Sequence, residues 1–570
     1  MNLGMLIGIS FVVLLLGYIF YGRYLAKQWG VDFTKNALPT PAHELYDGID
    51  YCPAKTPVLM GHHFSSIAGA GPINGPIMAA FFGWLPVTLW LLIGGIFVGG
   101  VHDFGTLFAS VRNRGNSIAS VIGTSAGAKP KRLFLVFAYL AMLLYIAAQL
   151  SIVSGTFGAE FSSNGELLLN SNTIANSVTA IISVWFIVAA IVFGVLVYRY
   201  KFPVLWTTIF TLLALGGLMY LSFSFHPFYF SSRVWLFLLA LYVLVASVTP
   251  VWILLQPRDY LSSYLLYAMM AIALVSILWL HPTVAMPAFT GFKETTLGLG
   301  NLFPFLFITV ACGAVSGFHA LVSSGTSSKQ LDREGDALMI GYGGMLIESL
   351  LAVVSLCAIA YIWKDIKAVM ESGTEVNPTI IFARGLSTLT QGMFKDSISV
   401  TGPLYTFFVL SVSVFCLTSL DTATRIARYM FQELWIEEGQ TQETVTGYKR
   451  ILTNKYFATL FTVTLGVLLG HAGYVHIWPL FGATNQLLAA LALLGVASWL
   501  RYIGRNNRMI YIPMAFMLVV TFVALAETIV KNYNSVLAGD VLWSGIRLVI
   551  AGLLLLLALK LVFNVLKRNK

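Results

Sequence analysis

Two acidic residues stand inside apolar stretches of this sequence, where proton chemistry is the first function to consider. Glu348 lies near the centre of the apolar range 337–362, among isoleucine and leucine residues. A carboxyl group in apolar surroundings prefers its neutral form, so Glu348 is a candidate proton carrier; a structural hydrogen bond to a neighbouring helix is the alternative. Asp421 is a second candidate for proton coupling, although an ion pair with Arg425, one helical turn further on, is the simpler explanation.

Two segments rich in helix-breaking or hydroxyl-bearing residues interrupt the apolar pattern. Residues 69–76 read Gly-Ala-Gly-Pro-Ile-Asn-Gly-Pro, and residues 323–328 read Ser-Ser-Gly-Thr-Ser-Ser. Glycine and proline disfavour continuous helix, and an unwound segment offers N–H groups to an anion or carbonyl oxygens to a cation. Close packing of helices on small residues is the alternative. The candidate substrate- or ion-binding residues around these two predicted breaks are His63, Ser65, Ser66, Gly69, Ala70, Gly71, His319, Ser323, Ser324, Gly325 and Thr326.

Histidines adjoin both predicted breaks: His62 and His63 precede the first, and His319 precedes the second. A proton relay or a substrate contact is one use for these side chains, and helix packing is the other; packing is the better explanation for His62. Neighbouring residues point in different directions on a helix, so His62 and His63 form no metal pair, and the sequence contains no His-Glu-x-x-His zinc motif. We therefore expect neither a metal nor a cofactor.

Further pairs of polar residues lie in or beside apolar ranges. Each pair has two possible roles: part of a gate, or hydrogen bonding that holds neighbouring helices together. These pairs are His102-Asp103, Arg258-Asp259 and Asn485-Gln486. Asn485 completes the set of candidate binding residues. Arg547 and Glu527 carry opposite charges on the last two apolar ranges, and mutual pairing is the simplest explanation for them.

The elements that must position these side chains are membrane helices. Hydrophobic residues make up 58% of the chain and charged residues only 10%, too few to cover a water-soluble protein of 570 residues. Apolar runs of about 20 residues recur from end to end and lack the alternation of barrel strands. The sequence thus predicts an all-α, polytopic membrane helix bundle of about 15 spans. The predicted spans are 3–20, 58–82, 85–107, 133–153, 178–197, 204–223, 234–255, 264–280, 302–322, 337–362, 404–420, 457–470, 477–500, 509–529 and 541–562.

The distribution of basic residues predicts the orientation of these spans. If the N-terminus is outside, 25 of the 34 Lys and Arg residues fall on the cytoplasmic side, seven fall outside and two lie within spans. Cytoplasmic loops carry an excess of Lys and Arg, so we expect an N-out, C-in arrangement in a bacterial inner membrane. The net charge of +10 is scattered over short loops, which argues against nucleic-acid binding. The loop 363–403 is long enough to hold an amphipathic helix.

A short sequence match suggests an internal repeat. Residues 61–69 and 317–325 share the pattern Gly-x-His-x5-Gly, and each segment opens a block of about seven predicted spans. An odd number of spans makes the two blocks inverted, which together with broken helices is a design of secondary transporters. We therefore divide the chain into an extra N-terminal span and loop (1–57), a first repeat (58–301) and a second repeat (302–570). The four cysteines show neither zinc spacing nor a disulfide framework.

The first break carries a family resemblance. The segment from Gly61 to Ile73, Gly-His-His-Phe-Ser-Ser-Ile-Ala-Gly-Ala-Gly-Pro-Ile, resembles the signature of the carbon-starvation protein A (CstA) family. Further stretches similar to family segments, in the same order, are 102–105, 257–261, 316–319, 324–326, 420–425 and 482–487. The resemblance spans nearly the whole chain. It implies a fold like that of the amino acid, polyamine and organocation transporters, and an activity described for the family as pyruvate-proton symport or peptide uptake. This chain is shorter than the better-known members, so the resemblance implies transport rather than one particular substrate.

Several functions are compatible with these features. Proton-coupled uptake of a small carboxylate such as pyruvate explains the breaks, Glu348 and the resemblance, and uptake of small peptides or amino acids explains them almost as well. Sodium coupling stays open, because carbonyls and hydroxyls at the breaks suit that ion. A channel would need a repeated pore signature. A membrane enzyme would need convergent nucleophile, base or metal ligands, and the sequence offers no convincing set. The expected partners are thus a small-molecule substrate, a coupling ion and the lipid bilayer.

Overall fold

The computed structural model describes residues 1–568 except 35–38, 49–50, 163, 251, 295–299, 311, 372–376, 395–400, 437–443 and 472. Lys35, Lys395 and Lys570, which entered the charge distribution, lie outside the described residues. Within the described part, the chain is all-α apart from one antiparallel pair of two-residue strands, β1 (Lys293–Glu294) and β2 (Gly300–Asn301). The predicted fold class is thus confirmed.

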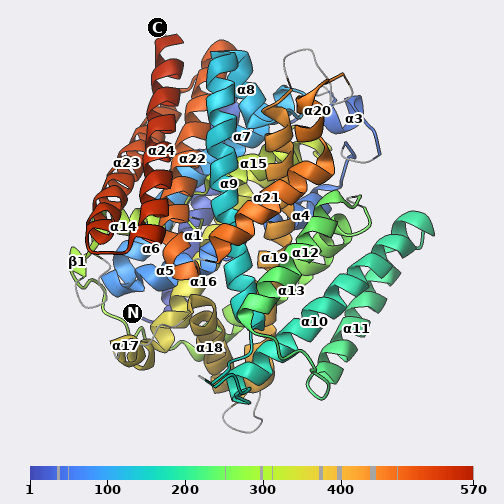
Figure 1. Ribbon diagram of the computed structural model, residues 1–570, viewed down its shortest axis with the longest axis vertical. Helices are drawn as coiled ribbons and strands as arrows, with labels where there is room; N and C mark the ends of the chain where they lie inside the picture. Colours follow the sequence, from blue (N-terminus) through green and yellow to red (C-terminus); the bar gives the residue numbers. More distant parts are fainter. Residues whose placement is uncertain are drawn as a thin grey trace.

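The first half of the chain is a series of helices, drawn from blue to green in Figure 1. Short π- or 3-10-helical turns adjoin several of them. Its elements are α1 (Leu3–Leu16), η1 (Gly17–Gly22), α2 (Arg23–Trp29), α3 (Pro41–Glu44), α4 (Thr56–Ile67), α5 (Gly71–Ala79), η2 (Ala80–Phe82), α6 (Trp84–Gly94), η3 (Gly95–Gly99), α7 (Gly100–Arg112), α8 (Ile118–Ala126), α9 (Ala128–Phe157), α10 (Ser171–Gly194), η4 (Val195–Arg199), α11 (Val204–Ser222), α12 (Ser232–Val248) and α13 (Leu255–Leu280).

The second half follows the same pattern. Its elements are α14 (Leu302–Thr309), α15 (Gly317–Gly325), η5 (Ser327–Lys329), η6 (Leu338–Gly343), α16 (Gly344–Tyr361), α17 (Trp363–Glu371), α18 (Pro378–Gln391), η7 (Gly392–Phe394), α19 (Thr401–Glu433), α20 (Tyr448–Leu452), α21 (Lys455–Gly470), α22 (Tyr474–Tyr502), α23 (Arg508–Leu537) and α24 (Val541–Arg568). The described residues of the predicted loop 363–403 form α17, α18, the turn η7 and the start of α19, and α18 packs into the bundle against α5, α16 and α19.

Every predicted span coincides with a helix or with a pair of shorter helices. Among the described residues, 11 helical stretches are long and apolar enough to cross a membrane, and two shorter apolar helices, α12 and α21, accompany them. The predicted spans 58–82 and 302–322 are instead divided, the first into α4 and α5 and the second into α14 and α15. Helix is the state that satisfies backbone groups in lipid, which is why hydropathy alone located these elements.

The divided helices lie in the interior of the bundle. The most apolar 18-residue stretch of α22 is entirely buried, whereas only 22% of the corresponding stretch of α11 is buried. In Figure 1, α10 and α11 lean against one edge of the molecule, and α23 and α24 form another edge. The inner helices α9, α16, α19 and α22 therefore surround the polar residues, and the outer helices face the membrane.

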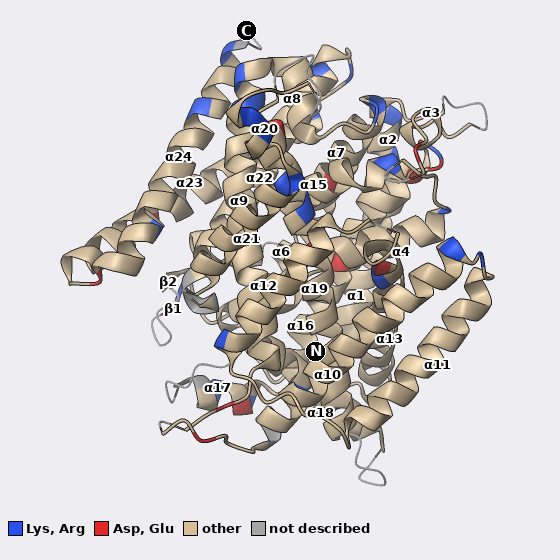
Figure 2. Cartoon of the chain, turned by 45° about the vertical axis from the view of Figure 1, so that its right-hand side comes forward, with Lys and Arg blue, Asp and Glu red and all other residues tan. Residues whose placement is uncertain are grey.

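Basic residues gather at one end of the molecule. Figure 2 shows Lys and Arg around α8, α20 and the C-terminus, with few at the opposite end near α17 and α18. This distribution agrees with a cytoplasmic C-terminus. Several of the basic residues counted as loop charges lie within helices instead, and Arg258 in α13 and Arg425 and Arg428 in α19 are also buried.

The shared Gly-x-His-x5-Gly pattern does not occupy equivalent places in the structure. Residues 61–67 end α4, before an interruption of the helix, whereas residues 317–325 form α15, after an interruption. Both pairs of short helices, α4 with α5 and α14 with α15, still consist of two helices separated by a non-helical segment. The division into inverted repeats at residues 301 and 302 stays a prediction.

Candidate functional site

The first interruption occupies residues 68–70, between α4 and α5. Ala68 leaves the helical conformation at φ −76° and ψ 65°, and α5 begins at Gly71 with Pro72 in its first turn. The break is shorter than the glycine and proline pattern predicted, because α5 continues through Pro76. Proline is well tolerated at the start of a helix, where no N–H partner is needed. The predicted break thus exists, and the N-terminus of α5 opens into the buried interior.

Polar groups from two other helices surround this break. A side chain at Gly69 would begin 2.9 Å from Tyr145 Oη, 3.0 Å from Gln149 Nε2 and 3.2 Å from Ser419 Oγ. Ser419 Oγ donates a hydrogen bond to the Ser66 carbonyl at 3.2 Å. Tyr145 and Gln149 belong to α9, and Ser419 belongs to α19. The absence of a side chain at Gly69 therefore lets the unwound backbone approach a polar cluster.

The second interruption lies earlier than predicted. The helix stops after Thr309 and resumes at Gly317, whereas Ser323, Ser324 and Gly325 form the last turn of α15. The prediction of a break at 323–328 was therefore wrong for these three residues. Serine is compatible with a helix when its hydroxyl bonds the carbonyl four residues back, as Ser324 Oγ does with Ala320 at 2.7 Å.

Asn485 and Gln486 of α22 hold the second interruption in place. Asn485 Oδ1 accepts a hydrogen bond from the Phe318 N–H at 3.0 Å, and Asn485 Nδ2 donates to Ser316 Oγ at 3.1 Å. Gln486 Nε2 donates to the Phe307 carbonyl at 2.8 Å. The bonds to the Phe318 N–H and the Phe307 carbonyl satisfy backbone groups beside the broken helix. Asn485 is therefore occupied by the Phe318 backbone and the Ser316 side chain.

The candidate hydroxyls fall into two groups. Ser65, Ser66 and Ser323 are buried, and their Oγ atoms have no hydrogen-bond partner among the described residues. Ser324 and Thr326 already bond the carbonyls of Ala320 and Val322. Buried polar groups are normally satisfied, so the first group is the one available to a solute or an ion.

The candidate residues that offer only backbone groups, Ala70, Gly71 and Gly69, also divide into some engaged in packing and one beside the polar cluster. Ala70 caps α5 and accepts the Asn74 N–H at 2.8 Å. Gly71 faces Cys312, since a Cβ added at Gly71 would overlap the Cys312 side chain. Gly71 therefore serves the packing of α5 against the second interruption, and Gly69 is the glycine beside the polar cluster.

A buried row of ionisable side chains passes between the two interruptions. His102 Nδ1 lies 2.6 Å from Asp103 Oδ1, His319 Nδ1 lies 2.7 Å from Asp103 Oδ2, and His319 Nε2 lies 3.3 Å from Glu348 Oε2. All four side chains are fully buried. They come from α7, α15 and α16, so three helices contribute to one network. His319 Nε2 and both Glu348 oxygens form no hydrogen bond among the described residues, so the 3.3 Å approach of His319 Nε2 to Glu348 Oε2 is an ion-pair distance without hydrogen-bond geometry.

His63 borders this row without joining it. Its Nδ1 atom hydrogen-bonds Ser327 Oγ at 2.8 Å, while its Nε2 atom is buried without a partner among the described residues. The ring also packs against Gly344, one turn before Glu348 on α16. His63 therefore keeps one nitrogen available on the α16 side.

Asp421 pairs with a different arginine from the one predicted. Its Oδ2 atom accepts hydrogen bonds from Arg258 Nη1 and, at 2.7 Å, from the Tyr242 hydroxyl, and Arg258 also donates to Thr418 at 3.1 Å. Arg425 donates instead to backbone carbonyls at the end of α12. The predicted pairing with Arg425 is wrong because α13 and α12, distant in sequence, pack on this face of α19.

Two further sequence predictions can be compared with the structure. His62 Nδ1 lies 2.9 Å from Asp259 Oδ2, so His62 ties α4 to α13, in line with its expected packing role.

Arg547 was expected to pair with Glu527 but lies 3.6 Å from Asp540 and donates to Ser544. Asp540 precedes α24 and is nearer than Glu527, which lies ten residues before the end of α23.

Sequence reasoning missed Tyr145 and Gln149, and it noted Asp103 only as part of a polar pair. Gln149 carried a usable signal, because an amide in the apolar range 133–153 is unusual in a membrane helix. Tyr145 carried none, since tyrosine is common among apolar residues. Within the described part of the chain, no group of three or more His, Cys, Asp or Glu side chains is arranged to hold a metal ion.

Comparisons with known proteins identify the family. The family described as "Carbon starvation protein CstA" matches residues 2–379 and 368–524. A "Peptide transporter CstA" of Escherichia coli is 34% identical over 90% of this chain and 79% of that protein, and one of Bacillus subtilis is 32% identical over 91% and 89%. A "Pyruvate/proton symporter BtsT" of Escherichia coli is 33% identical over 85% of this chain and 75% of that protein.

Among solved structures, a manganese transporter of Eremococcus coleocola aligns with 92% of this chain at a TM-score of 0.46 and 11% identity, a likeness that carries no argument here. The curated relatives are named as transporters, which confirms the prediction of a transporter rather than an enzyme. The family match over almost the whole length, the membrane helices and the relatives above 30% identity agree. This multi-pass membrane transporter belongs to the carbon starvation protein CstA family.

Proposed function

We propose that the protein takes up a small carboxylate such as pyruvate together with a proton, and that the contact between His319 and Glu348 carries the proton. The observation behind this proposal is a single imidazole held between two buried carboxyl groups, Asp103 at 2.7 Å and Glu348 at 3.3 Å. Buried ionisable residues are costly in a membrane protein and usually line a transport path.

The hydrogen-bonding capacity of His319 limits the proton states of this row. A neutral imidazole has one N–H donor and one acceptor nitrogen, so it matches both carboxyls only if one of them is protonated. An imidazolium donates to both and requires both carboxyls to be ionised. Moving one proton between His319 Nε2 and Glu348 Oε2 interconverts the two states, once a side-chain rotation brings these atoms, 3.3 Å apart, into hydrogen-bond geometry. Exchange with water on either side then loads or unloads that proton.

The substrate position follows from the first break. Ser65, Ser66 and the backbone around Gly69 present polar groups beside Tyr145 and Gln149. The N-terminus of α5 adds the positive end of a helix dipole, which favours a carboxylate. Glu348 and His319 contact the same two broken helices, through α16 on α5 and through α15 itself. Binding of the substrate and binding of the proton would therefore both act on the same two broken helices.

Peptide uptake is the second candidate, because several relatives carry that name. A peptide has the same terminal carboxylate and would use the same helix N-terminus. It needs a larger cavity and a partner for its ammonium group, and the free oxygen of Glu348 offers such a partner.

Uptake into proteoliposomes tests the proposed function. We expect pyruvate to accumulate when the interior is alkaline and to equilibrate without accumulation under a sodium gradient alone. At 1:1 coupling, a gradient of about one pH unit supports about tenfold accumulation, since 1.4 kcal/mol corresponds to a factor of ten. Accumulation of dipeptides but not pyruvate would replace the carboxylate with a peptide. Accumulation driven only by sodium would exclude the proton relay.

A substitution at the first break tests the substrate position. We expect Gly69→Leu to lower uptake at least about a hundredfold, because its side chain would occupy the space in front of Tyr145, Gln149 and Ser419. Gly217→Leu is the matched control, since Gly217 is exposed on α11 with nothing within 4 Å of an added Cβ. Both variants should elute as single species in detergent. Normal uptake by a folded Gly69→Leu protein would assign the break to helix packing.

A further inference from the structure

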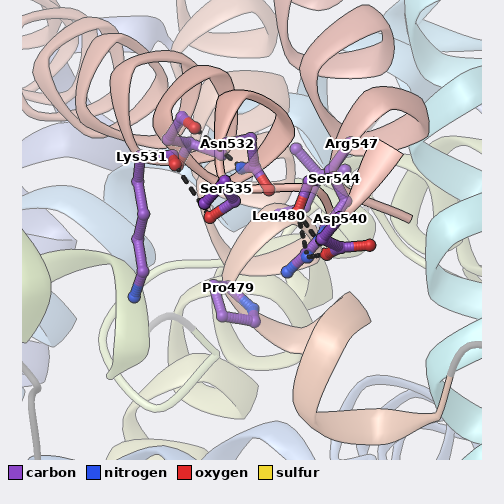
Figure 3. Close-up of a pocket in the computed structure, with 10 residues that line it drawn as sticks. Pro479, Leu480, Lys531, Asn532, Ser535, Asp540, Ser544 and Arg547 are labelled. Carbon is purple, nitrogen blue, oxygen red and sulfur yellow. Dashed lines mark hydrogen bonds and ion pairs between the residues drawn. The ribbon is translucent and has the colours of Figure 1, made fainter. Parts of the chain in front are cut away.

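A polar cavity of about 510 Å³ lies away from the broken helices, between the start of α22, the end of α23 and the start of α24 (Figure 3). Its polar lining includes Lys531, Asn532 and Ser535 from α23, and Ser544 and Arg547 from α24. Asp540, in the turn between these helices, also lines the cavity. Pro479 and Leu480 of α22 form part of its wall.

Both cationic side chains are directed into this space. Figure 3 shows Lys531 extending from α23 and the Arg547 guanidinium lying beside Asp540 and Ser544. Within the described part of the chain, Lys531 forms no ion pair, and Arg547 has only the half-exposed Asp540 at 3.6 Å. Two cations and one carboxylate leave a net charge of about +1, which matches one phosphodiester group.

The depth of these cations matches the edge of the bilayer. Lys531 lies six residues before the end of α23 and Arg547 six residues after the start of α24, so each is about 9 Å from its helix end at 1.5 Å per residue. The turn between α23 and α24 lies at the opposite end of α24 from the C-terminus, so the N-out, C-in arrangement expected from the basic residues puts the cavity at the outer leaflet. Basic residues are scarce on the outer side, because membrane proteins concentrate them in cytoplasmic loops. The preference that sets the orientation of the helices therefore does not explain two basic residues in one outer cavity.

An apolar cleft continues from the polar cavity. Leu480 and Arg547 line both spaces, and the cleft is otherwise lined by apolar side chains from α9, α21, α22 and α24: Leu144, Leu469, Ile477, Trp543, Ile546 and Ile550. The cleft itself holds only about 20 Å³, too little for an acyl chain, but an exposed apolar stripe of α24 begins beside it at Ile546 and continues through Val549, Leu553 and Leu556. A soluble anion gains nothing from such a stripe, whereas the acyl chains of a lipid bury apolar surface on it. The stem of Arg547 passes between the two environments, as long basic side chains do at membrane interfaces.

We propose that this cavity binds one anionic glycerophospholipid of the outer leaflet, with its phosphodiester between Lys531 and Arg547 and its acyl chains along the exposed apolar stripe of α24. Asn532, Ser535 and Ser544 supply hydrogen bonds to the headgroup. The lipid wedges between the α23–α24 pair and the start of α22. It thereby supports the helix whose Asn485 and Gln486 hold the second interruption.

Native mass spectrometry of the purified full-length protein tests this proposal. The ligands are phosphatidylglycerol, phosphatidylcholine, and glycerophosphoglycerol, which is the same headgroup without acyl chains. We expect the protein to bind one phosphatidylglycerol more tightly than the other two. The double variant Lys531→Gln/Arg547→Gln should bind it about thirtyfold more weakly, which corresponds to about 2 kcal/mol.

Lys560→Gln is the matched control, because Lys560 is an exposed cation of α24 that lines neither space. It should leave lipid affinity unchanged, and all variants should show the thermal unfolding of the parent in the absence of added lipid. Equal affinity of the parent and the double variant for phosphatidylglycerol would overturn the proposal. Tight binding of glycerophosphoglycerol would make the cavity a site for soluble anions. Equal binding of phosphatidylcholine would reduce it to an ordinary lipid contact.

Discussion

Glu348→Gln is expected to abolish proton-driven accumulation while preserving exchange of substrate across the membrane. Glutamine resembles the protonated carboxyl in shape and can donate to the neutral nitrogen of His319, but it releases no proton. The protein can then bind substrate and change conformation, yet substrate and proton are no longer linked in one cycle. Internal and external substrate concentrations should become equal under a pH gradient that gives the parent about tenfold accumulation.

Counterflow of labelled substrate and uptake driven by a pH gradient should be measured on the same proteoliposomes. Glu527→Gln is the matched control, because Glu527 is an exposed carboxyl on α23 with no part in the buried row. It should accumulate substrate like the parent. If Glu348→Gln also accumulates substrate normally, Glu348 is structural, and Asp103 or His63 must carry the proton instead.

The buried pair of Arg258 and Asp421 gives the largest expected effect on stability. Asp421→Asn leaves a fully buried arginine with the Tyr242 hydroxyl and Thr418 as neutral partners. Loss of one partner from a buried ion pair typically costs about 3–5 kcal/mol, because the other charge stays in a medium of low dielectric constant. We therefore expect a large fall in the unfolding temperature of Asp421→Asn in detergent.

The double variant Arg258→Gln/Asp421→Asn should recover most of this loss, since it removes both charges together. Asp540→Asn is the surface control, because Asp540 is half exposed and its pairing with Arg547 is long. Exposed pairs contribute only about 0–1 kcal/mol, so its unfolding temperature should scarcely change. If the double variant is no more stable than Asp421→Asn, the two residues are not energetically coupled.

These two experiments separate the roles of Glu348 and Asp421, which the sequence could not distinguish. Both appeared as acids in apolar helices. Among the residues that the structure describes, Asp421 faces an arginine of opposite charge and Glu348 faces a histidine. A carboxylate that accepts hydrogen bonds from an arginine and a tyrosine is fixed in a structural pair, whereas one facing an imidazole can exchange a proton. Asp421 is therefore better suited to hold α19 on α13 than to couple transport to protons.

Sequence alone determined the membrane class, the helical state and the approximate ends of the helices. Each of these follows from local composition, because about 20 apolar residues and internally satisfied backbone groups suffice to define a membrane helix. The break near Gly69 was predictable for the same reason, since glycine and proline act on their own stretch of backbone. The second break was predicted to begin at Ser323, whereas the helix continues to Gly325, because serine tolerates a helix in which its hydroxyl bonds a carbonyl of the preceding turn.

Only the tertiary structure decided which polar residues meet. Asp103 and His319 are 216 residues apart, Arg258 and Asp421 are 163 apart, and Ser316 and Asn485 are 169 apart. Helix periodicity gives the face on which a side chain lies but not the helix that packs against that face. Arg425 was the nearest opposite charge to Asp421 along the chain, yet α13 brings Arg258 closer in space. Partners in a membrane bundle are set by helix packing, which depends on the whole chain at once.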